Sequence, residues 1–166
     1  AVGAAPGLKA VQVRVEGIVP VLGRARSIAW TGVRAELPVD GSDPAWAAPV
    51  RGLRRWIESA PRLAAGTSVP LGAEGLPPVR LPGERAGDRM AVRDAVVRWP
   101  SGGARPDLVA HGLALESAAC RAPGRILHWR RLTVDRLDGT DSPAAAGCIL
   151  EWVETETRAW VLDCVL

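Results

Sequence analysis

The segment from residue 148 to 164 constrains the fold most, because it is nearly a mirror image about Glu156. On either side of a Thr-Glu-Thr run, each half carries Cys, Leu and Trp at every second position. Alternation with a period of two is typical of β-strands that bury one face. We therefore predict a C-terminal β-hairpin over 148–164 with its register centred on Glu156. On the core face this register pairs Trp152 with Trp160, Leu150 with Leu162 and Cys148 with Cys164, and the two cysteines are close enough for a disulfide.

The same period of two predicts further strands over 8–22, 26–37, 90–99 and 125–137. The alternation changes phase at Thr31–Gly32 and again near Arg130–Arg131, and each change predicts a β-bulge. Residues 107–120 fit either the face of a helix or the face of a strand. Since their surroundings are rich in strands, we favour a strand there.

One amphipathic helix is predicted near 49–60. Apolar side chains recur at helical spacing from Val50 to Ile57, Pro49 suits a first turn, and Pro61 ends the helix. The apolar stripe consists of Trp46, Val50, Leu53 and Ile57. Residues 61–89 follow with five prolines and five glycines, which predicts a long loop or arm that becomes ordered by contact with a neighbouring chain or partner.

These elements predict a single domain, residues 1–166, of the α+β class. It would be predominantly antiparallel β and either a sandwich or barrel-like, because 166 residues suit about one domain and strands outnumber helices. No apolar run approaches the length of a membrane span, and the N-terminal residues lack the pattern of a signal peptide.

The composition limits the classes of partner. The chain has 21 basic and 18 acidic residues, and its net charge is only +3. Its basic residues are almost all arginine, which is typical of GC-rich coding, and they are spread along the chain rather than gathered in a stripe. Nucleic acid is therefore a disfavoured partner. The three cysteines form no Cys-x-x-Cys motif and leave the redox compartment, and with it the localisation, undetermined.

Motifs that carry chemistry are missing. The sequence contains no phosphate loop, dinucleotide fingerprint, HExxH or G-x-S-x-G elbow. Cys120 with His128 or His111 could form a thiolate–imidazole pair, and Cys120, His128, Cys148 and Cys164 could supply zinc ligands, but their spacing favours neither. Two Asp-Gly-Ser/Thr-Asp turns, at 40–43 and 138–141, suit plain turns better than calcium loops. We expect no catalytic residue, cofactor or metal site.

Tryptophan is the remaining lead, because the chain has seven tryptophans and neither Phe nor Tyr. Several lie near turns or beside arginines, where an exposed ring would mark an interface. The candidate interface residues are Trp46, Arg54, Arg55, Trp56, Trp99 and Trp129. We therefore expect a non-enzymatic domain that acts through protein–protein contacts or self-association. It would be a structural subunit of a larger assembly, such as a virion, phage or secretion-type particle, or a binding module. The alternative is a small enzyme or small-ligand carrier on a β-barrel.

Overall fold

A computed structural model describes residues 8–9, 12–19, 24–37, 50–54, 56, 64–70, 76, 85–103, 106–139 and 146–165. Within these residues ten strands form one sheet, and residues 50–54 and 56 are helical. The strands are β1 (Leu8–Lys9), β2 (Gln12–Val19), β3 (Arg24–Thr31), β4 (Arg34–Glu36), β5 (Ser68–Pro70), β6 (Arg89–Trp99), β7 (Leu108–Ala122), β8 (Arg125–Asp138), β9 (Ala146–Glu154) and β10 (Arg158–Val165).

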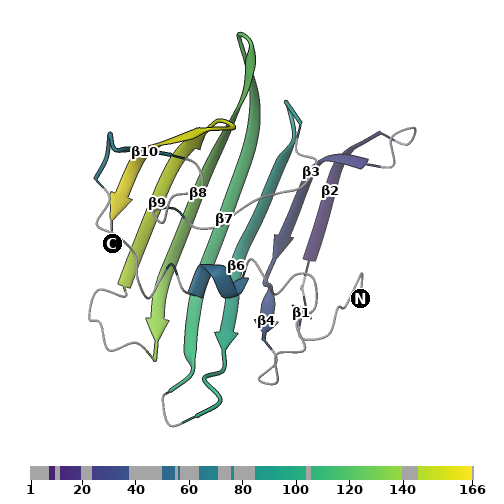
Figure 1. The fold of residues 1–166 in the computed structure, drawn as a ribbon. Helices are drawn as coiled ribbons and strands as arrows, with labels where there is room; N and C mark the ends of the chain where they lie inside the picture. Colours follow the sequence, from purple (N-terminus) through teal and green to yellow (C-terminus); the bar gives the residue numbers. More distant parts are fainter. Residues whose placement is uncertain are drawn as a thin grey trace.

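The sheet is open and mixed. From β6 to β10 consecutive strands are antiparallel neighbours, and β5 pairs with the far side of β10 (Figure 1). On the other side of β6 lie β3 and β4, end to end and both parallel to it, with β2 beyond β3 and β1 beyond β4. The prediction of a mostly antiparallel β fold is confirmed. The described residues form one sheet, without a second sheet or a closure between the end strands, so they show neither a sandwich nor a barrel.

The predicted change of phase at Thr31–Gly32 is confirmed as a break in the strand, but the predicted extra residue is not found, because Thr31 pairs with Arg93 and Arg34 with Val96 and the register against β6 does not shift. Gly32 has a φ of 65°, which glycine adopts without the steric cost that a Cβ would impose, and it separates β3 from β4. Asp94 in β6 (φ 49°) and Gly112 in β7 (φ 61°) interrupt their strands in the same way. The Gly32 amide donates to the Arg93 carbonyl at 3.0 Å, so the first two irregularities are neighbours. These positions change which residues of each strand face the core.

The second predicted bulge, near Arg130–Arg131, is wrong. The pairing of β8 with β7 and with β9 runs through both residues without a shift. The apparent change of phase arises because Arg130, a charged residue, occupies a core-facing position beside Leu132 and Val134. Its side chain is 4% exposed, and it is accommodated there by a buried carboxylate.

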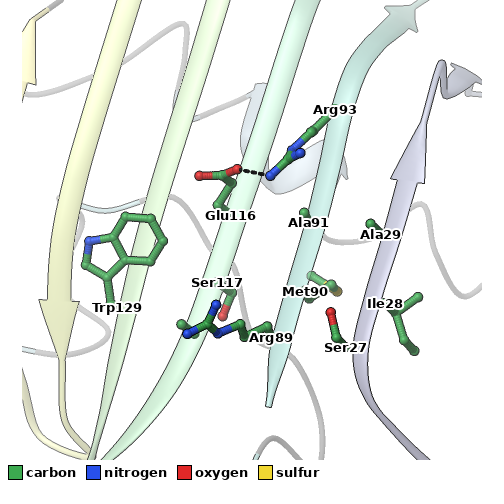
Figure 2. Close-up of a pocket in the computed structure, with 11 residues that line it drawn as sticks. Ser27, Ile28, Ala29, Arg89, Met90, Ala91, Arg93, Glu116, Ser117 and Trp129 are labelled. Carbon is green, nitrogen blue, oxygen red and sulfur yellow. Dashed lines mark hydrogen bonds and ion pairs between the residues drawn. The ribbon is translucent and has the colours of Figure 1, made fainter. Parts of the chain in front are cut away.

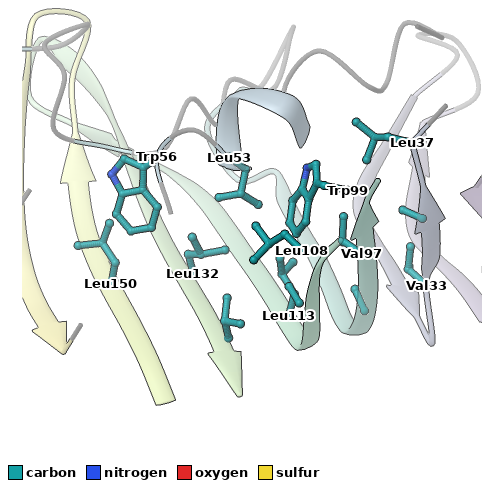
Figure 3. Close-up of a cluster of buried hydrophobic side chains, with 14 of the residues drawn as sticks. Val33, Leu37, Leu53, Trp56, Val97, Trp99, Leu108, Leu113, Leu132 and Leu150 are labelled. Atoms are coloured by element: carbon teal, nitrogen blue, oxygen red, sulfur yellow. The ribbon is translucent and has the colours of Figure 1, made fainter. Parts of the chain in front are cut away.

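One face of the sheet carries the hydrophobic core, and the helix packs on it (Figure 3). Leu53 and Trp56 lie over the sheet, and the Trp99 indole Nε1 donates to the Val50 carbonyl at 2.9 Å. The predicted burial of Leu53 is confirmed, whereas Trp46 and Ile57 lie outside the described residues. The largest fully buried side chains on this face are Trp99, Trp152, Leu37, Leu108, Leu132 and Leu150.

The C-terminal hairpin is confirmed, but its predicted register is wrong. Thr155 and Arg158 close the loop: the Thr155 amide donates to the Arg158 carbonyl at 2.8 Å, and the Thr155 hydroxyl accepts from the Arg158 amide at 3.2 Å. This leaves a two-residue loop and moves the register by one residue. Trp152 therefore faces Val161 across the hairpin, and it lies on the opposite face of the sheet from Trp160.

A second shift, between Val161 and Asp163, displaces the far end of the hairpin again. Cys164 consequently pairs with Leu150, and Cys148 pairs with Val134 of β8. The predicted cross-strand cysteine pair is wrong, because each of the two irregularities moves the strands past one another by one residue.

Part of the 61–89 segment is regular structure. Ser68–Pro70 form β5, and the Gly66 amide and Thr67 carbonyl bond to Val161 at 2.8 Å each. At the other end the Gly87 amide donates to the Ala119 carbonyl at 2.7 Å. The expectation of a segment ordered only by a partner is wrong for 64–70, which pairs within the chain. Most of the remaining residues, 71–75 and 77–84 among them, lie outside the described part.

Candidate functional site

The face of the sheet opposite the helix carries a row of small and polar residues. Register pairs join Ser27, Arg89, Ala118, Trp129 and Val153 in one line across β3, β6, β7, β8 and β9. The next line runs through Ala29, Ala91, Glu116, Arg131 and Glu151. Side chains alternate between faces along a strand, so all of these point away from the hydrophobic core. We call this surface the outer face.

A hollow of about 450 Å³ lies on the outer face between β3 and β8 (Figure 2). Three of its lining residues are alanines, Ala29, Ala91 and Ala118. Their one-carbon side chains leave space between longer neighbours. Arg93 and Glu116 close one side through an ion pair of 2.8 Å. The lining residues are Ser27, Ile28, Ala29, Arg89, Met90, Ala91, Arg93, Glu116, Ser117, Ala118 and Trp129. The hollow therefore combines small apolar residues with charged and aromatic ones.

Trp129 is held in place at the edge of the hollow. Its indole Nε1 donates to Glu151 Oε1 on the neighbouring strand β9 at 2.8 Å, which restrains the ring. Figure 2 shows the Arg89 side chain extending across β7 toward the strand that carries Trp129. Ala118 lies between these two residues in the register and leaves room for that approach. A cation and an aromatic ring thus flank the same small residue.

Arg131 is flanked in the register by two carboxylates, and each of them already has another ion-pair or hydrogen-bond partner. Its cross-strand neighbours are Glu116, which is paired with Arg93, and Glu151, which accepts from Trp129. The Arg131 Nε is buried, and it is the one such side-chain atom without a hydrogen-bond partner among the described residues. Because the Trp129 indole is neutral, the charge of Glu151 offsets that of Arg131 beside the hollow.

A polar cluster is buried on the core face beneath the outer face. Arg130 Nε donates to Glu154 Oε1 at 2.7 Å, and an Arg130 terminal nitrogen donates to the Ser117 hydroxyl at 2.6 Å. The Trp152 indole donates to the other oxygen of Glu154 at 3.0 Å. Each oxygen of the carboxylate therefore has its own donor, and this arrangement suits a structural ion pair.

The predicted interface residues do not gather in one place. Trp56 and Trp99 are buried in the core at 7% and 1% exposure, which leaves no free surface at these two positions. The Arg54 guanidinium donates to the Trp99 carbonyl at 3.4 Å. Trp129 borders the hollow, while Trp46 and Arg55 lie outside the described residues.

The cysteine and histidine candidates are also separated. Cys120 pairs with Leu127 and His128 pairs with Ala119, so alternation directs the two side chains to opposite faces. His111 lies toward the other end of β7, where its Nε2 is 2.9 Å from Asp138 Oδ2. Burial raises the pKa of the free Cys164 thiol, with a smaller contribution from Asp163. No group of three or more His, Cys, Asp or Glu within the described ranges is placed to hold a metal ion.

Asp107 joins the turn after β6 to the strand itself. The Ser101 amide donates to its carboxylate at 2.9 Å, and Arg98 donates twice, at 2.7 and 3.0 Å. The hydrogen bond from Ser101 and then that from Arg98 hold the pKa of Asp107 below its ordinary value. Asp107 in turn raises the pKa of Arg98. These hydrogen bonds hold the turn after β6 against the strand, so the role of the Asp107 carboxylate is structural.

Comparison of the chain with protein-family models, with curated proteins and with solved structures finds no match. The helix seen in the described part is too short to cross a bilayer.

Sequence reasoning missed Arg89, Arg93 and Glu116 as site residues. A signal was available, because Arg89, Ala91 and Arg93 share one face of a strand at a spacing of two. The hollow itself has no signature in the sequence, since residues from β3, β6, β7 and β8 meet only through the sheet.

Proposed function

We propose that this chain is a non-enzymatic β-rich domain that acts through protein–protein contacts, as a structural subunit of a larger assembly. The observation that carries the proposal is the edge of the sheet at β10. Strand β5 and the residues just before it pair with Arg158 to Val161, and no described residue pairs with the backbone of 162–165 on that side. An exposed strand edge presents unpaired N–H and C=O groups to another chain.

The side chains along this edge support the proposal. Leu162 is 48% exposed and Val165 is 53% exposed, which are the two highest values among the exposed large hydrophobic residues described. Apolar residues on an open edge favour the addition of a strand from another protein, because main-chain hydrogen bonds and apolar burial then form together. A second copy of this chain is the simplest partner for an assembly subunit.

The opposite edge differs in character. Strand β2 carries an ion pair between Arg14 and Glu16, whose side chains are 73% and 53% exposed. Charged side chains on an edge strand oppose uncontrolled pairing. The β10 edge is therefore the better candidate for a contact, and β2 supplies a matched control, because Val15 there is also exposed.

The test is the mass of the protein in solution. Val165→Lys places a charge on the β10 edge, and Val15→Lys makes the same change on the β2 edge. We expect a concentration-dependent oligomer for the wild type and for Val15→Lys by sedimentation velocity, and a monomer for Val165→Lys. A wild type that stays monomeric at all concentrations would contradict the proposal, as would an oligomer equally retained by both variants.

A further inference from the structure

The hollow on the outer face is the strongest remaining feature. Four of its residues have distinct chemical characters: Arg89 is a cation, Trp129 an aromatic wall, Ala118 part of the floor and Ser27 a hydroxyl. The hollow lies on the face of the sheet and away from the edge at β10, so a role for it is independent of strand addition at that edge.

The charges at the hollow favour an anion. Arg93 and Glu116 neutralise each other through their 2.8 Å ion pair. Arg89 has no ion pair or hydrogen bond to any other residue in the described part of the chain, so its charge is uncompensated there. Arg131 is offset by its cross-strand neighbour Glu151, because the Trp129 indole that bonds Glu151 is neutral, so Arg89 carries the excess positive charge. The hollow therefore has a net positive surround.

The shape and the wall favour a flat apolar group next to that anion. The indole of Trp129 is restrained by Glu151, so little rotational freedom is lost when a ring packs against it. Ala118 lies between Arg89 and Trp129 in the register, and its short side chain leaves the intervening space open. A volume of about 450 Å³ is within the usual range for small-molecule sites.

We propose that this hollow binds a small aromatic carboxylate. The carboxylate would accept from the Arg89 guanidinium, whose planar array of donors matches two oxygens. The Ser27 hydroxyl, on the strand next to Arg89, would provide a further donor. The aromatic ring would lie over Ala118 against Trp129. A phosphate monoester fits less well, because Arg89 balances one negative charge and the second would lie near Glu116, whose cation Arg93 is already paired with it.

The experiment measures binding of 1-naphthoate to the full chain by saturation-transfer NMR and by calorimetry. The comparison ligands are 1-naphthamide, which keeps the rings and loses the charge, and acetate, which keeps the charge and loses the rings. We expect saturable binding of 1-naphthoate. Each comparison ligand should bind at least about tenfold more weakly, which corresponds to a loss of about 1.4 kcal/mol of binding free energy.

Three variants locate the site. Arg89→Gln removes the free charge and should weaken binding of 1-naphthoate at least about tenfold. Ala118→Leu fills the floor and should abolish binding, while it leaves every charged group in place. Arg121→Gln is the matched control, because Arg121 is an exposed arginine at an odd-numbered position of β7 and so faces away from Ala118. It should bind as the wild type does.

Three results would overturn the proposal. Equal binding of 1-naphthamide and 1-naphthoate would show a site for apolar rings rather than for anions. Unchanged binding in both Arg89→Gln and Ala118→Leu, or no saturable binding to the wild type, would show that the hollow is not the site. None of these results bears on the oligomeric state, so this proposal and the one for the β10 edge fail separately.

Discussion

The buried pair of Arg130 and Glu154 allows the sharpest test of the structure. Glu154→Gln keeps the size of the side chain and removes its charge. The carboxylate receives Arg130 Nε on one oxygen and the Trp152 indole on the other. Glutamine has a single acceptor oxygen, and its NH₂ group is a donor. One of the two donors is therefore left facing another donor inside the core.

The expected loss follows from the burial of the pair. The side chains of Arg130 and Glu154 are 4% and 11% exposed, so solvent cannot replace the missing charge. Removal of one partner from a buried ion pair costs about 3–5 kcal/mol, because the remaining charge stays buried without compensation. With a urea dependence of about 2 kcal/mol/M, the unfolding midpoint should fall by about 1.5–2.5 M.

The assay is urea unfolding followed by tryptophan fluorescence and by circular dichroism. Glu116→Gln is the matched control, because it makes the same change in an Arg–Glu pair whose side chains are 62% and 34% exposed. Exposed pairs contribute about 0–1 kcal/mol, so this variant should unfold close to the wild type. Arg130→Met combined with Glu154→Gln should recover part of the loss, with a coupling energy of about 2 kcal/mol.

A loss below about 1 kcal/mol for Glu154→Gln would refute the reasoning. The same conclusion would follow if the two glutamine variants were equally stable, because the expected difference comes from the burial of one Arg–Glu pair and the exposure of the other.

Three further outcomes are expected. Leu53→Ala should lower the free energy of unfolding by about 2–5 kcal/mol in the same assay, because the helix contributes this buried side chain to the core. Gly112→Ala should destabilise much more than Gly66→Ala, since both have positive φ but a Cβ at 112 would collide with the Asp135 side chain as far in as its own Cβ, at 2.8 Å, whereas nothing lies within 4 Å at 66; equal melting temperatures would count against this. Asp107 has a lowered pKa in the fold, so its contribution to stability is present above its ordinary value of 3.8 and is lost as the pH falls through the folded pKa. Asp107→Asn should therefore narrow the difference between the melting temperatures at pH 6 and pH 2.

Local pattern was enough to place most of the strands. Alternation with a period of two identified β6, β8 and the C-terminal hairpin within a few residues, and the change of phase beside Gly32 identified the break between β3 and β4. These features depend on neighbouring residues and on the conformational range of glycine, so the sequence carries them directly. The burial of Leu53 was predictable for the same reason, since helical spacing shows which face is apolar.

In contrast, only the tertiary structure decided which residues lie opposite one another across the sheet. Alternation shows which residues share a face, but it does not show which residue lies opposite. Thr155 closed the hairpin loop one residue away from the symmetric register, and the irregularity at Leu162 added a second step, so Cys148 and Cys164 were separated. Arg130 reads as a surface charge until Glu154, 24 residues later, is placed beside it. The hollow depends on four strands drawn from residues 27 to 129, and their contact exists only in the assembled sheet.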